Sequence, residues 1–335
     1  MTARAVIFGC SGPELTAEER AFFSDADPWG FILFTRNITT PAGVRRLVAS
    51  LRDAVGRAAP ILIDQEGGRV ARLQAPTWPE WPAALAYAQA AGDAHLREAM
   101  YLRGRLIAAD LQALGIDVNC APLLDVACAE THSIILNRTY GHDPATVALA
   151  ARAIAEGQLA GGVLSVAKHI PGHGRATLDS HHDLPRLDTP LEELRAVDFE
   201  AFRRVSDLPM AMTAHVVFTA VDADHAATLS PAMISLIRGE IGFEGLLMTD
   251  DLSMQALTGS LGERASSSLL AGCDLVLHCN GVMDEMEPVA ANTPRLEGRA
   301  AERADAALAL RKSPDAFDVA AARVRVREMT GLEHA

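Results

Sequence analysis

Eight short apolar runs recur along the 335-residue chain, each bounded by turn signals and followed by a stretch of helical composition. Runs that are apolar at every position are typical of parallel strands covered by helices, whereas half-exposed strands alternate apolar and polar residues. The runs are Ala5–Gly9, Phe31–Phe34, Ile61–Asp64, Val118–Leu123, Val163–Lys168, Met210–His215, Leu246–Asp250 and Leu275–Cys279. Eight such units predict an α/β fold, a single closed (β/α)8 barrel of the TIM type.

The same units extend over most of the chain, so we expect one catalytic domain over residues 1–335 and no second domain. No Gly/Ser linker, low-complexity tract or repeat interrupts them, and barrels commonly reach about 250 residues or more as one domain. Thr16–Glu19 reads as a capping box, and Ser230 precedes a proline at a helix start. The Ala-rich stretch Ala83–Leu114 predicts either one long helix or two.

Composition indicates the compartment. The first residues, MTARAVIFGCSGPEL, hold one early Arg and an apolar stretch too short for a signal peptide or a membrane span. The cysteines are odd in number and lie mostly in apolar runs, which favours reduced thiols over a disulfide framework. They are Cys10, Cys120, Cys128, Cys273 and Cys279. We therefore predict a cytoplasmic protein without disulfides.

A formal net charge of −13 at pH 7 argues against nucleic acid as a partner. A protein that binds nucleic acid needs clustered Lys and Arg to neutralise phosphates, and the sequence has no basic stripe. With membranes also disfavoured, we expect a small-molecule ligand.

Ionisable residues gather where the predicted strands end. Active sites of (β/α)8 barrels lie at these carboxyl ends, so such residues are candidates for chemistry. They are Asp64–Arg69, Lys168–Gly174, His215, the pair Asp250 and Asp251, and finally His278 and Asn280. A barrel without catalytic function would not need to concentrate ionisable groups there.

Six motifs among these residues carry a resemblance to a known family. They are ILIDQEGGRVARL, NRTYGHDP, AKHIPGHG, DSHHDLP, MTAHV and MTDDLSM, in this order along the chain. This series resembles glycoside hydrolase family 3, in particular its single-domain bacterial β-N-acetylglucosaminidases of peptidoglycan recycling. The resemblance extends from about Val6 to Gly281. It implies a retaining glycosidase that removes terminal β-linked N-acetylglucosamine.

The resemblance assigns two catalytic roles. Asp250 matches the nucleophile, and a carboxylate at the end of a strand suits attack on an anomeric carbon because the sheet holds its backbone in place. His181 matches the proton donor, and its ordinary pKa of about 6.5 lies close to neutral pH. Asp179, two residues earlier, would orient and tune that ring. The neighbouring His182 is the alternative, and the Asp-Ser-His spacing selects His181.

The family pattern also implies a set of sugar-binding residues. A carboxylate can accept hydrogen bonds from vicinal hydroxyls, and Lys and Arg donate to oxygens. The matching positions are Asp64, Arg72, Arg138, Lys168 and His169. The alternative for them is an internal ion-pair network that supports the barrel mouth, and it applies most to Arg138. His173 and His215 are expected to support these residues from behind. No metal and no cofactor are implied.

The chain departs from the family pattern in two places. Ile170 stands where an aromatic residue is usual, and Arg175 stands where an acidic or small polar residue is common, which leaves the loop conformation and the aglycone contacts open. Aromatic residues make up only 5% of the chain, so stacking under the sugar would fall to few of them, such as Trp29 or Phe34. The tryptophan-bearing segment from Pro76 is expected to pack beneath the mouth.

Three alternatives remain at this point. A metal-dependent hydrolase on the same barrel would draw its ligands from His169, His173, His181, His215, Asp250 and Asp251, although Lys168 beside them would repel a cation. A non-catalytic sugar-binding protein would require loss of the nucleophile or the acid, and both are present. A phosphorylase of the same family would resolve the glycosyl-enzyme with phosphate, which a histidine would not repel.

The expected substrate is a muropeptide carrying N-acetylglucosamine on anhydro-N-acetylmuramic acid, bound by a monomer.

Overall fold

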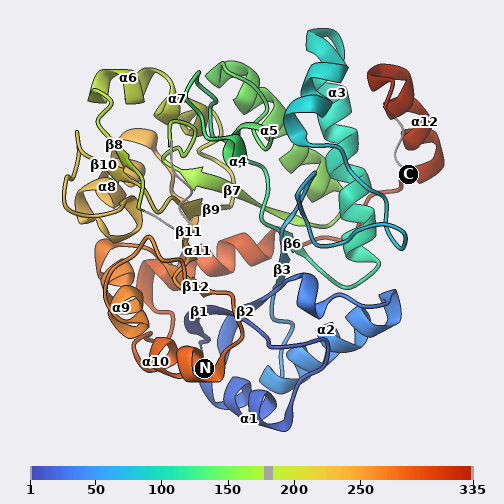
Figure 1. Cartoon of the computed structure of the whole chain (residues 1–335). Helices are drawn as coiled ribbons and strands as arrows, with labels where there is room; N and C mark the ends of the chain where they lie inside the picture. The colour runs from blue at the N-terminus through green and yellow to red at the C-terminus, as the bar shows by residue number, and fades with distance from the viewer. Residues whose placement is uncertain (1, 177–183, 333–335) are drawn as a thin grey trace.

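Eight parallel strands close into a barrel at the centre of the molecule (Figure 1). The structure is a computed structural model and describes residues 2–176 and 184–332. In chain order the barrel strands are β1 (Arg4–Gly9), β2 (Pro28–Leu33), β3 (Ile61–Ile63), β6 (Val118–Asn119), β7 (Leu164–Ile170), β9 (Met210–Thr213), β11 (Leu246–Asp251) and β12 (Leu275–His278). They pair in this order around the barrel, with β12 returning to β1. Each lies within or overlaps one predicted run, so the predicted barrel is confirmed.

Side chains along the strands alternate between two cores. The inward set fills the barrel, and it includes Ile7, Leu62, Val166 and Met248. The outward set packs under the surrounding helices. Both sets are apolar, which explains why the strands read as continuous apolar runs in the sequence. Residues of α11 (Gly298–Ala309) join the inward core and close the end at which the strands begin.

The helices surround the barrel, as Figure 1 shows. They are α1 (Ala17–Ala26), α2 (Pro41–Val55), α3 (Ala84–Gln112), α4 (Ser133–Leu136), α5 (Pro144–Ala160), α6 (Leu191–Ala196), α7 (Asp198–Arg203), α8 (Pro231–Leu236), α9 (Leu261–Ala271), α10 (Met283–Ala291), α11 and α12 (Val319–Thr330). The capping box at Thr16 and the Ser230 cap with Pro231 at the first position are both confirmed. Gly92, at φ 58° and ψ 172°, divides α3 into two helices.

Two short ribbons stand on the carboxyl ends of the barrel strands. β4 (Gln65–Gly67) and β5 (Val70–Ala71) form an antiparallel hairpin directly after β3, and β8 (Arg186–Leu187) pairs with β10 (Val217–Phe218). The hairpin requires glycine at its turn, because Gly68 has φ 58° and a Cβ there would lie 2.9 Å from the Ala83 Cα. The five cysteines are free thiols. Within residues 2–176 and 184–332, no helix combines the length and the apolar character needed to cross a membrane.

Candidate active site

The inward alternation of the strands continues into the polar residues at their ends. Asp64, Lys168 and Asp250 each lie two residues after an inward-facing core residue, so their side chains point into the mouth of the barrel. The sheet thus fixes the backbone of three ionisable side chains from β3, β7 and β11 around one space.

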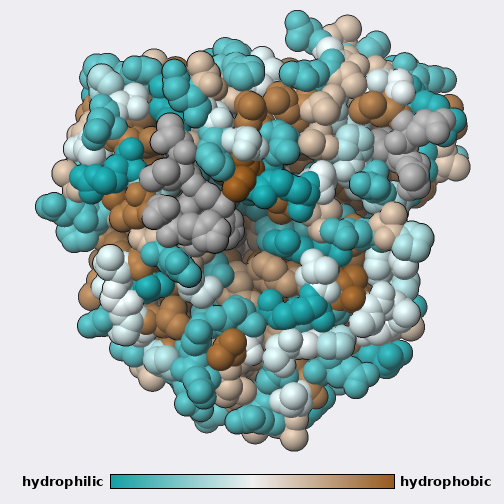
Figure 2. All heavy atoms as spheres, viewed as in Figure 1, coloured by the Kyte–Doolittle hydropathy of each residue, from teal (hydrophilic) through white to brown (hydrophobic). Residues whose placement is uncertain are grey.

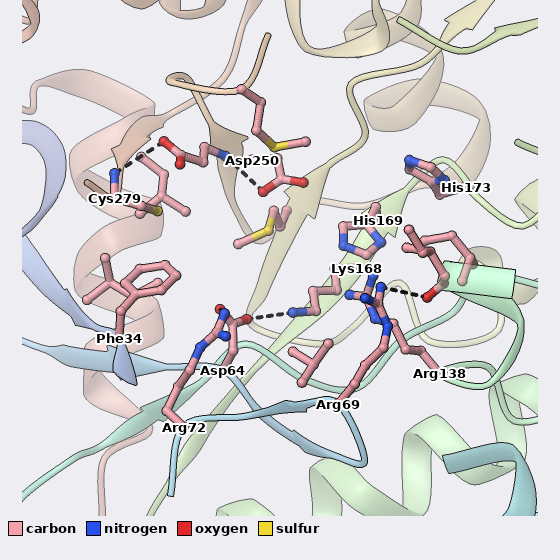
Figure 3. A pocket seen from close by; sticks show the side chains of 18 residues that line it. Phe34, Asp64, Arg69, Arg72, Arg138, Lys168, His169, His173, Asp250 and Cys279 are labelled. Carbon is pink, nitrogen blue, oxygen red and sulfur yellow. Dashed lines mark hydrogen bonds and ion pairs between the residues drawn. The ribbon is translucent and has the colours of Figure 1, made fainter. Parts of the chain in front are cut away.

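These side chains line a cavity of about 230 Å³ at the carboxyl ends of the strands (Figure 3). Figure 2, in the view of Figure 1, shows hydrophilic residues gathered around a depression near the middle of this face of the molecule. The lining residues are Ile32, Phe34, Asp64, Arg69, Val70, Arg72, Ile134, Ile135, Arg138, Lys168, His169, His173, Met212, Asp250, Asp251, Met254, Leu277 and Cys279. All five residues predicted to bind the sugar are among them, together with the predicted nucleophile.

An ion-pair network occupies one wall of the cavity. Lys168 Nζ lies 2.7 Å from Asp64 Oδ1 and 2.7 Å from Glu66 Oε1. Arg72 contacts the other oxygen of Asp64 at 3.0 Å. Arg138 pairs with Glu66 through two hydrogen bonds of 2.9 and 2.8 Å. Two carboxylates and three cations are therefore held in one array, and Figure 3 shows its members Asp64, Arg72, Lys168 and Arg138.

The network keeps its members charged. Burial by itself raises the pKa of Asp64, but Lys168 and Arg72 outweigh burial and hold that pKa well below its ordinary value. Burial acts against the charge of Lys168 as well, and the two carboxylates beside it raise its pKa above the ordinary value. The wall thus presents permanent donors and acceptors to any ligand in the cavity.

Asp250 lies on another wall of the cavity, and Figure 3 shows its carboxylate near the His169 ring. Its Oδ1 accepts a hydrogen bond of 2.8 Å from the backbone amide of Asp251. Burial raises the pKa of Asp250, but His169, His215 and the Asp251 amide together outweigh burial and leave the pKa below the ordinary value. Asp250 is therefore a carboxylate at neutral pH, which is the form that can attack an electrophilic carbon.

Asp125 anchors the segment that carries two of the cavity histidines. Its Oδ2 lies 2.8 Å from His169 Nδ1, and its Oδ1 accepts the backbone amides of His169 and His173 at 3.2 and 2.7 Å. Because the carboxylate is an acceptor only, His169 Nδ1 carries the proton. Asp125 is fully buried, so it acts from behind the cavity by orienting His169.

Because of Asp125, the free energy of unfolding should decrease at acidic pH. Burial raises the pKa of Asp125, but His169 and the hydrogen bonds from His169 and His173 outweigh burial and lower it to about 2. In the unfolded chain an aspartate titrates near 4, so the folded protein binds fewer protons between these values. The resulting stabilisation is present above about pH 4 and is lost as the pH falls through 2.

This contribution can be measured. We expect Asp125→Asn to lower the free energy of unfolding at pH 7 by at least about 2 kcal/mol and to flatten its decline between pH 5 and 2. Urea unfolding across this range would test the expectation. It would be contradicted by a variant whose free energy of unfolding falls with pH as steeply as that of the parent.

The structure gives roles to two residues to which the sequence reasoning assigned none. Glu66 joins Lys168 to Arg138, and Asp125 orients His169. Glu66 lies inside a motif quoted above, and Asp125 follows the predicted strand Val118–Leu123 by two residues, so both had a positional signal. The ion-pair alternative for Arg138 also has support, because this residue lines the cavity and pairs with Glu66 at once. His181, His182 and Asp179 lie outside the described residues.

The two aromatic residues that were expected to stack under the sugar lie in different parts of the barrel. Trp29 was a wrong candidate, because it lies at the beginning of β2 and is buried in the barrel core, away from the mouth. Phe34 follows the end of β2 and lines the cavity, with the Arg72 guanidinium 4.7 Å from its ring centre. Trp81 is buried against Tyr87, as expected for packing beneath the mouth. Arg175 pairs with Asp198 and Glu193 at 2.7 Å each.

The potential metal ligands of the cavity are dispersed. Among the residues that the structure describes, no three His, Cys, Asp or Glu side chains are grouped so that they could hold an ion. Two of the histidines at or beside the cavity already have other partners: His169 bonds to Asp125, and His215 bonds to Thr228 and to the Asp251 carbonyl.

Comparison with known proteins adds independent findings. Residues 7–308 match the model of the glycosyl hydrolase family 3 N-terminal domain. A protein of Chromobacterium violaceum named beta-hexosaminidase is 35% identical over 337 residues, which cover 97% of this chain and 94% of that protein.

Two solved structures are similar over nearly the whole chain. NagZ from Neisseria gonorrhoeae, solved in complex with zinc ion, has a TM-score of 0.86 and 29% identity, covering 98% of this chain and 99% of that chain. A family 3 β-N-acetylglucosaminidase from Paenibacillus has a TM-score of 0.85 and 30% identity, covering 97% of this chain and 67% of that one.

Proposed function

The chain belongs to glycosyl hydrolase family 3, and we propose that it is a retaining β-N-acetylglucosaminidase that releases terminal β-linked N-acetylglucosamine. It is a glycosidase, as the family and the relatives indicate. The observation that carries the proposal is the placement of Asp250, an ionised carboxylate, in the same cavity as the array of Asp64, Lys168 and Arg72. An ionised carboxylate serves as the nucleophile of a retaining glycosidase, and fixed charges suit hydroxyl and amide recognition.

The proposed reaction has two displacements. In the first, an Asp250 oxygen attacks the anomeric carbon, the bond to the aglycone oxygen breaks, and His181 donates a proton to that oxygen. In the second, His181 removes a proton from water, water attacks the same carbon, and the bond to Asp250 breaks. Two inversions give net retention. The Asp251 amide holds Asp250 Oδ1 at 2.8 Å and therefore directs the carboxylate. Asp179 would orient the His181 ring.

The ion-pair array around Asp64 and Lys168 is proposed to hold the sugar. Asp64 would accept hydrogen bonds from hydroxyl groups, and Lys168, Arg72 and Arg138 would donate to hydroxyl and acetamide oxygens. Asp125 orients His169 through Nδ1, so Nε2 is the ring nitrogen that would face the sugar. The array supports binding because its own ion pairs fix these side chains before a ligand arrives.

The relatives support the substrate class. One bears the name beta-hexosaminidase, and one of the similar structures is a β-N-acetylglucosaminidase. We propose that the physiological substrate is a muropeptide with N-acetylglucosamine on anhydro-N-acetylmuramic acid, and that the enzyme acts in the cytoplasm as a monomer. Residues 1–335 would form one catalytic domain.

Substrate preference tests the proposal. We expect kcat/KM on an aryl β-N-acetylglucosaminide to exceed that on the matching β-glucoside by at least about 100-fold, because donors fixed for the acetamide would otherwise stay unpaired. An aryl β-N-acetylgalactosaminide completes the series. Equal kcat/KM values on the first two substrates would refute the assignment to N-acetylglucosamine.

Two additions to this assay separate the alternatives. Turnover should be the same with and without inorganic phosphate, and no sugar 1-phosphate should form. Formation of that product would identify a phosphorylase. Activity should also be unchanged after exhaustive chelation, whereas loss that a divalent metal restores would favour the metal-dependent hydrolase.

A further inference from the structure

His215 is a buried histidine to which the proposed reaction assigns no role. It follows β9 and is fully buried. Its Nε2 lies 3.0 Å from the carbonyl oxygen of Asp251, and its Nδ1 lies 2.7 Å from Thr228 Oγ1. We propose that His215 is a positioning residue: its neutral ring donates to Asp251 and so holds the backbone that aims Asp250. This inference rests on the proposed role of Asp250 as nucleophile.

The partners of the ring define where its proton sits. A carbonyl oxygen only accepts, so Nε2 must carry a hydrogen and donate to Asp251. In a neutral ring Nδ1 is then an acceptor, and the single proton of the Thr228 hydroxyl goes to Nδ1 at 2.7 Å rather than to the Ala214 carbonyl at 3.1 Å. Thr213 supports this arrangement, since its hydroxyl lies 2.8 Å from Thr228 Oγ1. Burial also keeps the pKa of His215 below its ordinary value, which agrees with a neutral ring.

Asp251 connects His215 to the nucleophile. Its backbone amide donates to Asp250 Oδ1 at 2.8 Å. Its own carboxylate accepts the backbone amides of Ser253 and Cys279 at 3.0 and 3.2 Å. With the His215 bond to its carbonyl, Asp251 is held from the turn after β11, from β12 and from β9. Together with the Met254 amide, which donates to the same Asp251 carbonyl at 3.1 Å, these contacts place the amide that directs Asp250.

Loss of the His215 donor removes the contact from β9. The Asp251 carbonyl then keeps its hydrogen bond from the Met254 amide at 3.1 Å but loses its link to β9, and the end of β11 can shift until the amide no longer points at Asp250 Oδ1. Asp250 would lose a hydrogen bond that favours its charged form, which raises its pKa. Both displacements use Asp250, so both steps should slow, whatever the leaving group.

Two substitutions of His215 separate the donor from the volume. Gln places an amide nitrogen near the position of Nε2 and keeps a donor, whereas Met fills similar space without one. We expect His215→Met to lower kcat/KM about 10- to 100-fold, equally for aryl glycosides with good and poor leaving groups, and to move the acid limb of the pH profile to higher pH. His215→Gln should stay within about threefold of the parent.

Thr228→Val tests the orientation of the ring at nearly constant volume. It removes the hydroxyl that faces Nδ1 and should give a smaller loss, about 3- to 10-fold, with the same shift of the acid limb. Ser165→Ala is the matched control, because it deletes a buried hydroxyl elsewhere in the barrel, on β7, where it bonds to Gln158 of α5. It should leave kcat/KM within about twofold.

Thermal unfolding and covalent labelling distinguish a loss of positioning from a loss of stability and from a failure of the proposed function. The other ionisable side chains that line the cavity are unchanged in every variant, so a moved acid limb reports Asp250. They are Asp64, Arg69, Arg72, Arg138, Lys168, His169, His173, Asp251 and Cys279. A lower Tm for His215→Met with unchanged kcat/KM and acid limb would overturn the positioning role. A loss as large in His215→Gln as in His215→Met, with both folded, would overturn the donor role. Failure of a 5-fluoro N-acetylglucosaminyl inactivator, which keeps the 2-acetamido group, to label Asp250 in the parent would instead refute the proposed function.

Discussion

Asp250→Ala is expected to abolish turnover on every β-N-acetylglucosaminide, with a fall in kcat on the order of 10⁴- to 10⁶-fold. The carboxylate is needed to form the glycosyl-enzyme whether the leaving group is good or poor, so no substrate should rescue the variant. Steady-state assays on an aryl glycoside, a glycosyl fluoride and a natural disaccharide would measure the loss.

Two measurements make this prediction specific. A 2-fluoro or 5-fluoro glycosyl inactivator should add one sugar to the parent enzyme, and peptide mapping should place the label on Asp250. Asp207→Ala is the control, because Asp207 is an exposed carboxylate paired with Arg152 outside the cavity, and its loss should change kcat less than about twofold. A label on another carboxylate, or substantial turnover by Asp250→Ala, would contradict the assignment.

His181→Ala should give a different pattern, in which the loss depends on the leaving group. General acid catalysis contributes about 10²- to 10⁴-fold, and it matters most when the departing oxygen is basic. The variant should therefore lose most activity on natural disaccharides but still form the glycosyl-enzyme from nitrophenyl glycosides or fluorides. Hydrolysis of that intermediate should stay slow because the same histidine acts as base, so a burst followed by slow turnover is expected.

Further variants test which residue acts as the general acid. Asp179→Ala should resemble a weaker version of His181→Ala, because a misoriented ring with a shifted pKa transfers protons less well. His225→Ala is the control, since His225 is an exposed histidine bonded to Asp222 outside the cavity, and it should have no effect. Equal losses on good and poor leaving groups in His181→Ala would remove the acid/base role and direct attention to His182.

Local patterns were enough to predict the barrel. Apolar runs bounded by turn residues identified all eight strands, and side-chain caps identified helix starts such as Thr16 and Ser230. These signals act within a few residues, so they survive without knowledge of the fold. Strand lengths were less predictable: Val118–Leu123 was expected as one strand, but regular pairing ends at Asn119 and a single bridge joins Leu123 to Lys168.

The candidate site was predictable as a set of residues but not as an arrangement. Position at the ends of strands selected Asp64, Lys168 and Asp250, and the family pattern added Arg72 and Arg138. It did not reveal that Glu66 lies between Lys168 and Arg138, nor that Asp125 orients His169. Phe34 and Trp29 looked equivalent in the sequence although they lie at opposite ends of the same strand.

The sequence by itself therefore determined the number of strands, the fold class and the residues that gather at the carboxyl ends of the barrel. Only the tertiary structure decided which of those residues touch. Asp64 and Lys168 are 104 positions apart and meet at 2.7 Å because the barrel closes, and His215 reaches Asp251 across 36 positions for the same reason. Contacts of this kind depend on strand register and barrel closure, which no local preference specifies.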